Sequence, residues 1–350
     1  MTSAPRRVLL IQLRRLGDVV LSTALLDDLH RAFPEAAVDM LVGAAAAPLL
    51  AGHPHLHERI VLDPDRSVAM WGEIRARRYD WVIDVQGSLR TALIARFSGA
   101  RVRVGWRIRA WRLFYTHAHP RGGPREYVAR ERQRLLELVG VVPGTPCPRI
   151  YLSADERLRG ERDARAAGAS PHAARVGFLL STREPAKDWD ADRFGTVAAA
   201  LARDGVTPIV FRTPGDEARV DQVRARTSRA IIMPPLDLRR FLGVLATCQV
   251  FVSGDTGPAH MADALGVPRV TVFGPTPPES WTPGLPTTIA VLGPGARVVR
   301  MRDRARLLAQ GHDFTGDITP DMVLGPVRAL LQGRTPRAPF PSSPIPTADD

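Results

Sequence analysis

Short apolar runs alternate with helical patterns along most of this 350-residue chain, and that alternation restricts the fold more than any other feature. The first run, residues 8–13, has the length of a strand and leads through a turn into a helical pattern that reaches Phe33. Buried strands that alternate with helices predict parallel sheets covered on both faces, so the expected class is α/β with Rossmann-like sheets. Further strands are predicted at residues 38–42, 60–62, 81–85, 102–104, 176–180, 207–211, 230–233, 250–253 and 269–273.

The chain is longer than a usual single domain, and its alternation is interrupted once. Residues 141–148 are rich in proline and glycine and mark a linker region, which a polar helical segment follows. We therefore predict a Rossmann-like domain at residues 1–168 and a second at residues 169–333, facing each other across a cleft. Residues 334–350, dominated by Pro, Ser and Thr, are expected to form a disordered tail.

Composition and charge restrict the class of protein further. No stretch approaches the roughly 18 apolar residues of a membrane span, and Arg14 cuts the first apolar run, which predicts a cytoplasmic protein. The two cysteines have no metal-binding spacing, so neither a zinc site nor a disulfide framework is expected. The net charge is +12, and nine arginines but no acidic residue lie between Asp84 and Glu126. Such a patch attracts phosphate-rich partners.

Two local features suggest an anion site in the second half. Lys187 is the single lysine among 48 basic residues, which favours a need for a compact ammonium, although chance survival is the alternative. A predicted strand at residues 250–253 leads through Gly-Asp-Thr-Gly into a helix with proline in its first turn. The backbone N–H groups of Thr256 and Gly257, together with the helix dipole, can bind an anion beside His260. The simpler alternative is an ordinary capped turn between a strand and a helix.

This turn and the segment Phe273-Gly-Pro-Thr-Pro277 resemble the signatures of glycosyltransferase family 9, the lipopolysaccharide heptosyltransferases. Leu16-Gly-Asp18 and the strand ending in Gln86-Gly87 match as well, so the resemblance spans nearly the whole chain up to Leu331. It implies the GT-B glycosyltransferase fold and inverting transfer of a heptose from ADP-heptose to the lipopolysaccharide inner core. A family-9 transferase with a different nucleotide sugar or acceptor glycan is the alternative.

Two other classes fit the residues less well. A basic nucleic-acid-binding protein is a remote alternative, because no helix-turn-helix, zinc-finger or RNP-type motif accompanies the charge. A nicotinamide-dependent dehydrogenase would need a Gly-x-Gly-x-x-Gly turn after the first strand, where only Gly17 is present.

The resemblance assigns roles to matching residues. Asp18, which the sequence alone would make the N-cap of a helix starting at residue 19, matches the proposed general base. In the second domain, the donor would contact Thr182, Lys187, Glu217, Leu236, Asp255, Thr256, Gly257 and His260. In the first domain, the acceptor would contact Gln86, Arg101, Arg103, Arg107 and Arg109.

The same resemblance implies the partners of the protein. They would be ADP-heptose or a similar nucleotide sugar and an anionic lipid-linked glycan, whose phosphates and carboxylates suit arginine. Peripheral contact with the inner face of the inner membrane is expected, and nucleic acid is not. The ADP-sugar is a substrate, so no cofactor is expected. A metal is not expected either, since lysine and helix dipole would stabilise the leaving group.

Overall fold

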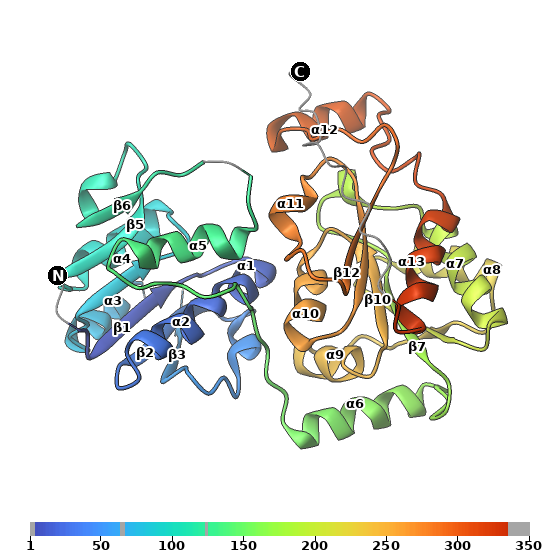
Figure 1. Ribbon diagram of the computed structural model, residues 1–350, viewed down its shortest axis with the longest axis horizontal. Coiled ribbons are helices and arrows are strands. Elements are labelled where there is room, and N and C mark those ends of the chain that lie inside the picture. Colours follow the sequence, from blue (N-terminus) through green and yellow to red (C-terminus); the bar gives the residue numbers. More distant parts are fainter. Residues whose placement is uncertain (1–3, 64–66, 123–124, 335–350) are drawn as a thin grey trace. The chain divides into compact units, whose positions relative to one another are not determined.

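The computed structural model describes residues 4–63, 67–122 and 125–334, which fold into two units that divide between Tyr151 and Leu152 (Figure 1). Within the described residues each unit contains one sheet of six parallel strands. This confirms the predicted α/β class with two Rossmann-like domains. Of the predicted tail at residues 334–350, all but Arg334 lies outside the described residues.

The first unit is built on a sheet with the strand order β3-β2-β1-β4-β5-β6. Helices α1, α2 and α5 contact one another, and α3 contacts α4. Residues of α3 and α4 share one core with Leu9 and Ile11 of β1. The strands are β1 (Arg7–Ile11), β2 (Ala37–Gly43), β3 (Glu58–Leu62), β4 (Trp81–Asp84), β5 (Val102–Trp106) and β6 (His117–His119). The helices are α1 (Leu16–Ser22), α2 (Ala24–Ala32), α3 (Ser67–Ala76), α4 (Leu89–Phe97) and α5 (Val128–Glu137), with short 3-10 helices η1 (Ala47–Leu50) and η2 (Arg112–Phe114).

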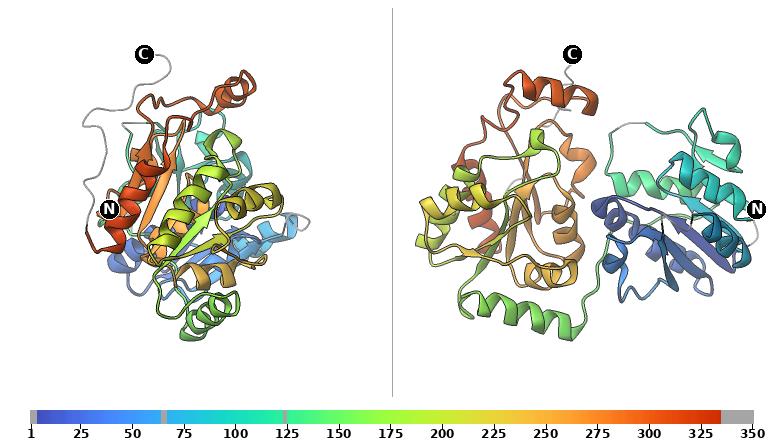
Figure 2. Two further views of the ribbon diagram at one scale, coloured as in Figure 1. Left: turned by 90° about the vertical axis from the view of Figure 1, so that its right-hand side faces the viewer. Right: turned by 180° about the vertical axis from the view of Figure 1, so that it is seen from behind.

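The second unit repeats this plan with the order β12-β11-β10-β7-β8-β9. Helices α7, α8 and α13 cover one face of its sheet and α9 and α10 the other (Figures 1 and 2). The strands are β7 (Arg175–Leu179), β8 (Thr207–Phe211), β9 (Ile231–Ile232), β10 (Val250–Gly254), β11 (Arg269–Phe273) and β12 (Thr288–Leu292). The helices are α6 (Ala154–Ala166), α7 (Ala191–Arg203), α8 (Glu217–Arg226), α9 (Leu238–Leu245), α10 (Gly257–Leu265), α11 (Pro278–Trp281), α12 (Met301–Ala309) and α13 (Pro320–Leu331), with a 3-10 helix η3 (Pro185–Lys187).

The central strands owe their continuous apolar sequence to burial on both faces. Leu9 and Ile11 point to a core that includes residues of α3 and α4, and the intervening Leu10 is also without exposed surface at 0%. Val250 and Val252 of β10 lie in the corresponding core of the second unit. Each buried side chain of this size stabilises the fold by about 1.5–3 kcal/mol, so these strands are fixed in the sheet centres.

Helix α6 packs on the second unit, so the division between the units falls before this helix. The predicted boundary at residue 168 placed α6 in the first domain and is corrected. The helix lies along α9, where a Cβ on Gly160 would come within 2.2 Å of the Gly243 backbone. Glu156 of α6 also pairs with Arg239 of α9 at 2.6 Å. These partners are far from α6 in sequence, which is why local pattern did not reveal them.

The sequence patterns also left some elements unpredicted. Strands β6 and β12 lie at sheet edges, and helices α4, α5 and α12 lie in stretches where arginine obscures the apolar stripe. The last helix, α13, begins after its N-cap Thr319 with Pro320 in the first turn, where the fixed φ of proline suits a helix. Among the helices of the described ranges, none combines the length and hydrophobicity needed to cross a membrane.

Candidate active site

The predicted site residues follow neighbouring strands at the point where each sheet order reverses. In the first sheet this point lies between β1 and β4, and in the second between β7 and β10. Open α/β sheets bind ligands at the carboxyl ends of the strands flanking such a point. Asp18 follows β1 and Gln86 follows β4, while Lys187 follows β7 and Asp255 follows β10. Motifs that are separate in sequence therefore meet in pairs.

Asp18 lies in the first turn of α1 and not at its N-cap. The helix begins at Leu16 with Arg15 as N-cap, so the helix start expected at residue 19 and the N-cap role are both corrected. The Asp18 Oδ2 accepts a hydrogen bond from the Arg15 backbone N–H at 3.3 Å. Its side chain keeps 27% exposure. The carboxylate is thus anchored and still accessible.

Arg132 of α5 is the main partner of Asp18. Its Nη2 lies 2.5 Å from Asp18 Oδ1, and its Nη1 donates to the Asp18 carbonyl oxygen and to Ser22 Oγ. The Arg132 side chain is only 7% exposed, and this burial lowers its pKa while the charge of Asp18 opposes that shift. A buried guanidinium therefore holds both the side chain and the backbone of the predicted base.

Gln86 binds the loop between β1 and α1, just before the helix that carries Asp18. Its Oε1 accepts from the backbone N–H groups of Leu13 and Arg14, at 3.0 and 3.2 Å. The turn after β4 is itself fixed by Asp84, whose Oδ1 accepts from the Gly87 N–H at 2.9 Å. Burial raises the pKa of Asp84 to about 6, against the opposing effect of its hydrogen bonds. The Gln86 carboxamide, predicted to contact the acceptor, is thus used inside the protein.

The predicted acceptor-binding arginines lie at two different edges of the first sheet. Arg107 and Arg109 follow β5 at the carboxyl edge, where Asp18 lies, and both are exposed. Arg101 precedes β5 at the opposite edge. The guanidinium of Arg103 donates to two backbone carbonyls, at 2.8 and 2.7 Å. The structure groups only Arg107 and Arg109 with the candidate base.

In the second unit, Lys187 lies on the short helix η3, close against the end of β10. A Cβ on Gly254 would come within 2.8 Å of the Lys187 carbonyl oxygen, so this glycine permits the approach. The Lys187 Nζ lies 2.8 Å from Asp255 Oδ2 and 3.6 Å from Glu184 Oε2. With 14% side-chain exposure, the ammonium is held by two carboxylates at the rim of the sheet.

Asp255 is a buried carboxylate with two donors on one oxygen. Its Oδ2 accepts from Lys187 Nζ and from Thr276 Oγ1, each at 2.8 Å. Burial acts to raise the pKa of Asp255, but the Lys187 ammonium, His260 and the hydrogen bonds outweigh it and hold that pKa below its ordinary value. Asp255 is therefore ionised at neutral pH and pairs with the Lys187 side chain as a carboxylate.

The predicted anion-binding turn opens α10. Thr256 is the N-cap with an extended backbone, and Gly257 is the first helical residue. Unpaired amides and a partial positive charge gather at such a helix end. His260 is buried in this first part of the helix, with its ring 5.7 Å from that of Trp281. Lys187 Nζ lies 5.9 Å from the same indole, so one aromatic ring borders both Lys187 and His260.

The other predicted donor residues lie farther along the same edge. Thr182 Oγ1 donates to the Glu184 carbonyl oxygen at 2.7 Å and so shapes the loop that carries Lys187. Glu217 is exposed in the first turn of α8, after β8. Leu236 is half-buried between β9 and α9. Every residue predicted to contact the donor therefore follows the carboxyl end of one of the neighbouring strands β10, β7, β8 and β9.

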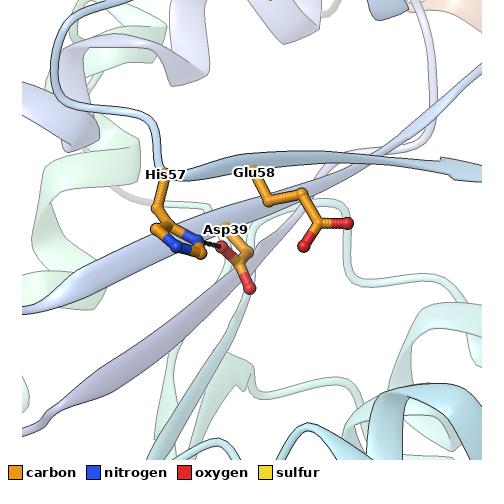
Figure 3. A group of neighbouring side chains, drawn as sticks. All are labelled: Asp39, His57 and Glu58. Atoms are coloured by element: carbon orange, nitrogen blue, oxygen red, sulfur yellow. Dashed lines mark hydrogen bonds and ion pairs between the residues drawn. The ribbon is translucent and has the colours of Figure 1, made fainter.

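One cluster in the described residues has the ligand types of a metal site. Asp39, His57 and Glu58 offer atoms within 4.8 Å of one another (Figure 3). They lie near the amino ends of β2 and β3, whereas Asp18 follows the carboxyl end of β1. The fully buried Asp39 accepts from Tyr79 at 2.6 Å and pairs with His57 at 2.7 Å, and Glu58 is paired with an arginine. Asp39 also pairs with Arg7 at 3.2 Å, so the carboxylates already have partners and the cluster joins strands β2 and β3 as a polar network.

Three residues at the candidate site were missed from the sequence. Thr276 belongs to a recognised segment, but its bond to Asp255 depends on the neighbouring strand. Trp281 has no local signal. Arg132 has one, since it occupies the apolar stripe of its helix with Ala129 and Leu136, where a charged residue needs a buried partner.

Two Rossmann-like units, one with a carboxylate at the point where its strand order reverses and the other with an ammonium and a helix N-terminus there, fit the arrangement expected of a GT-B glycosyltransferase. The family model described as glycosyltransferase family 9 (heptosyltransferase) matches residues 67–306. This chain therefore belongs to glycosyltransferase family 9.

Individual relatives agree in length and fold. The chain is 30% identical to lipopolysaccharide heptosyltransferase 1 of Pseudomonas aeruginosa, over 78% of this chain and 79% of the relative. It is 25% identical to lipopolysaccharide heptosyltransferase 2 of Escherichia coli K12, over 93% of this chain and 98% of the relative. The solved structure of E. coli ADP-heptose lipopolysaccharide heptosyltransferase II superposes with a TM-score of 0.77 at 23% identity, covering 93% and 99% of the two chains.

Proposed function

We propose that this glycosyltransferase moves a heptose, with inversion, from ADP-heptose to a hydroxyl of the lipopolysaccharide inner core. The observation that carries the proposal is the ionic Lys187–Asp255 pair beside the N-terminus of α10, which offers a cation and backbone donors to a pyrophosphate. The names of the relatives support the choice of heptose and of lipopolysaccharide. The second unit would bind the donor and the first unit the acceptor.

In the proposed reaction, the acceptor hydroxyl oxygen forms a bond to the anomeric carbon of the heptose. The bond from that carbon to the β-phosphate oxygen breaks, and ADP leaves with the electron pair. The hydroxyl proton passes to the Asp18 carboxylate. Within the part of the chain that the structure describes, its Oδ2 accepts a single bond, from a backbone N–H at 3.3 Å. The negative charge that develops on ADP is met by Lys187 and the α10 amides.

We further propose that the chain works at the inner face of the inner membrane without crossing it. Arg107 and Arg109 would contact the phosphates or acidic sugars of the lipid-linked acceptor, because both are exposed at the edge that carries Asp18. Arg101 and Arg103 are less suited to that role, since one lies at the other edge and the other is bound to backbone carbonyls.

Calorimetric titration with ADP-heptose, ADP-glucose and UDP-glucose tests the donor. Tightest binding of ADP-heptose is expected, and equal affinity for all three would remove the heptose claim in favour of another nucleotide sugar. Turnover of Asp18→Asn tests the base, with a loss of about 100-fold or more expected in kcat. Asp27→Asn is the matched control, because Asp27 has the same 27% exposure and an ion pair with His55 but no proposed role.

A further inference from the structure

We propose that Arg132 is a positioning residue for the catalytic base, fixing the Asp18 carboxylate in the one orientation that leaves Oδ2 for the acceptor proton. This inference rests on the proposed role of Asp18. It adds a residue of α5, distant in sequence, to the catalytic arrangement. Arg132 itself is too buried, at 7% side-chain exposure, to meet a substrate.

The contacts of Arg132 converge on a single turn. Among the described residues, every hydrogen bond from its guanidinium ends on α1: on the Asp18 carbonyl oxygen, on Asp18 Oδ1 and on Ser22 Oγ. Ser22 Oγ in turn donates to the Asp18 carbonyl oxygen at 2.8 Å. The planar fork thus binds main chain and side chain of Asp18 together, and the carboxylate cannot rotate without losing its Oδ1 bond.

This arrangement divides the two carboxylate oxygens by function. Oδ1 is 2.5 Å from a guanidinium nitrogen and is committed to it. Among the described residues, Oδ2 has the single 3.3 Å bond from the Arg15 N–H, and the Asp18 side chain as a whole keeps 27% exposure. A base must be held at the correct distance and angle from its proton, and a displacement of the order of 1 Å can cost about 100-fold in rate.

If Arg132 only helped α5 to pack, there would be no reason for all of its guanidinium bonds to end on Asp18 and Ser22. Another buried residue of the same helix, Gln133, already joins α5 to α2 by donating to Asp28 at 2.6 Å. Burying a guanidinium is costly, and an apolar side chain of similar volume commonly packs as well. Gln133 therefore supplies the matched control for a loosened helix.

The test compares Arg132→Met, Arg132→Lys and Gln133→Leu with the unaltered protein. Steady-state kinetics use ADP-heptose and lipopolysaccharide extracted from cells that lack inner-core heptose, and folding is checked by circular dichroism. For Arg132→Met we expect kcat to fall about 100-fold while KM for ADP-heptose changes less than about 3-fold. Arg132→Lys should recover part of the loss, and Gln133→Leu should leave kcat within about 3-fold of the unaltered protein.

Chemical rescue adds a readout that folding alone does not move. In Arg132→Ala, millimolar guanidinium should restore part of kcat, and it should restore nothing in Arg132→Ala combined with Asp18→Asn. The inference is overturned if Arg132→Lys turns over normally, if Arg132→Met and Gln133→Leu lose activity equally, or if guanidinium has no effect. Normal turnover of Asp18→Asn would instead overturn the proposed base, so the two failures are distinguishable.

Discussion

Replacing Lys187 by methionine tests the electrostatic reasoning at the donor edge without any substrate. Methionine keeps most of the side-chain volume but removes the ammonium that lies 2.8 Å from Asp255 Oδ2. Asp255 has only 4% side-chain exposure, so water cannot replace the lost partner. Removing one member of a buried ion pair costs about 3–5 kcal/mol in unfolding free energy.

The structure sets this loss at the lower end of that range. Thr276 still donates to Asp255 at 2.8 Å, and the positive end of α10 lies beside the carboxylate. We expect about 3 kcal/mol at pH 8.

The sign of the pH dependence follows from the pKa of Asp255. In the unaltered protein Lys187 holds that pKa below its ordinary value. The ionised Asp255 therefore stabilises the folded state above about pH 4, and this stabilisation is lost only in stronger acid. Without Lys187, burial raises the pKa, so the folded state takes up a proton more readily than the unfolded chain. The deficit should then shrink by about 1.4 kcal/mol for each pH unit below the raised pKa.

Hydrogen exchange of peptides from β7 and β10 measures the effect locally, at pH 8 and, after rate correction, at pH 5.5. Lys187→Met combined with Asp255→Asn is the control, and this double variant should regain at least half of the lost stability because no charge remains buried. A deficit that is equal at both pH values, or a double variant no more stable than the single one, would refute the reasoning.

Two further predictions concern folding. Gly160→Ala should destabilise the second unit by about 1–3 kcal/mol despite the better helix propensity of alanine, because the new Cβ would lie 2.2 Å from the α9 backbone. Gly72→Ala in α3, where a new Cβ would meet nothing within 4 Å beyond its own helix backbone and chain neighbours, should instead stabilise by up to about 1 kcal/mol; thermal melts that rank the two variants in the opposite order would contradict the packing argument. Burial lowers the pKa of His53 to about 4, so the unfolded chain takes up a proton on this side chain more readily than the folded protein. The free energy of unfolding should therefore decrease as pH falls from 6.5 to 4. Denaturation of His53→Phe against the unaltered protein should show this difference, up to about 3 kcal/mol, and parallel stability curves would show that His53 does not cause it.

The sequence by itself determined the elements and the local chemistry of this protein. Apolar runs of strand length identify the parallel strands, because strands buried on both faces need uninterrupted apolar sequence. The turn from Asp255 to His260 can also be predicted from the sequence, since the strand, the N-cap and the first helical turn are contiguous in the chain. Lys187 is marked by being the only lysine.

The tertiary structure alone decided which of these residues meet. Arg132 reaches Asp18 across 114 positions, and Lys187 reaches Asp255 across 68, because strand order and crossovers bring the loops to one edge. The periodicity of a sequence indicates which face of a helix or strand is buried. Which other residues pack against that face depends on the order of the strands and on the connections between them, which periodicity does not contain.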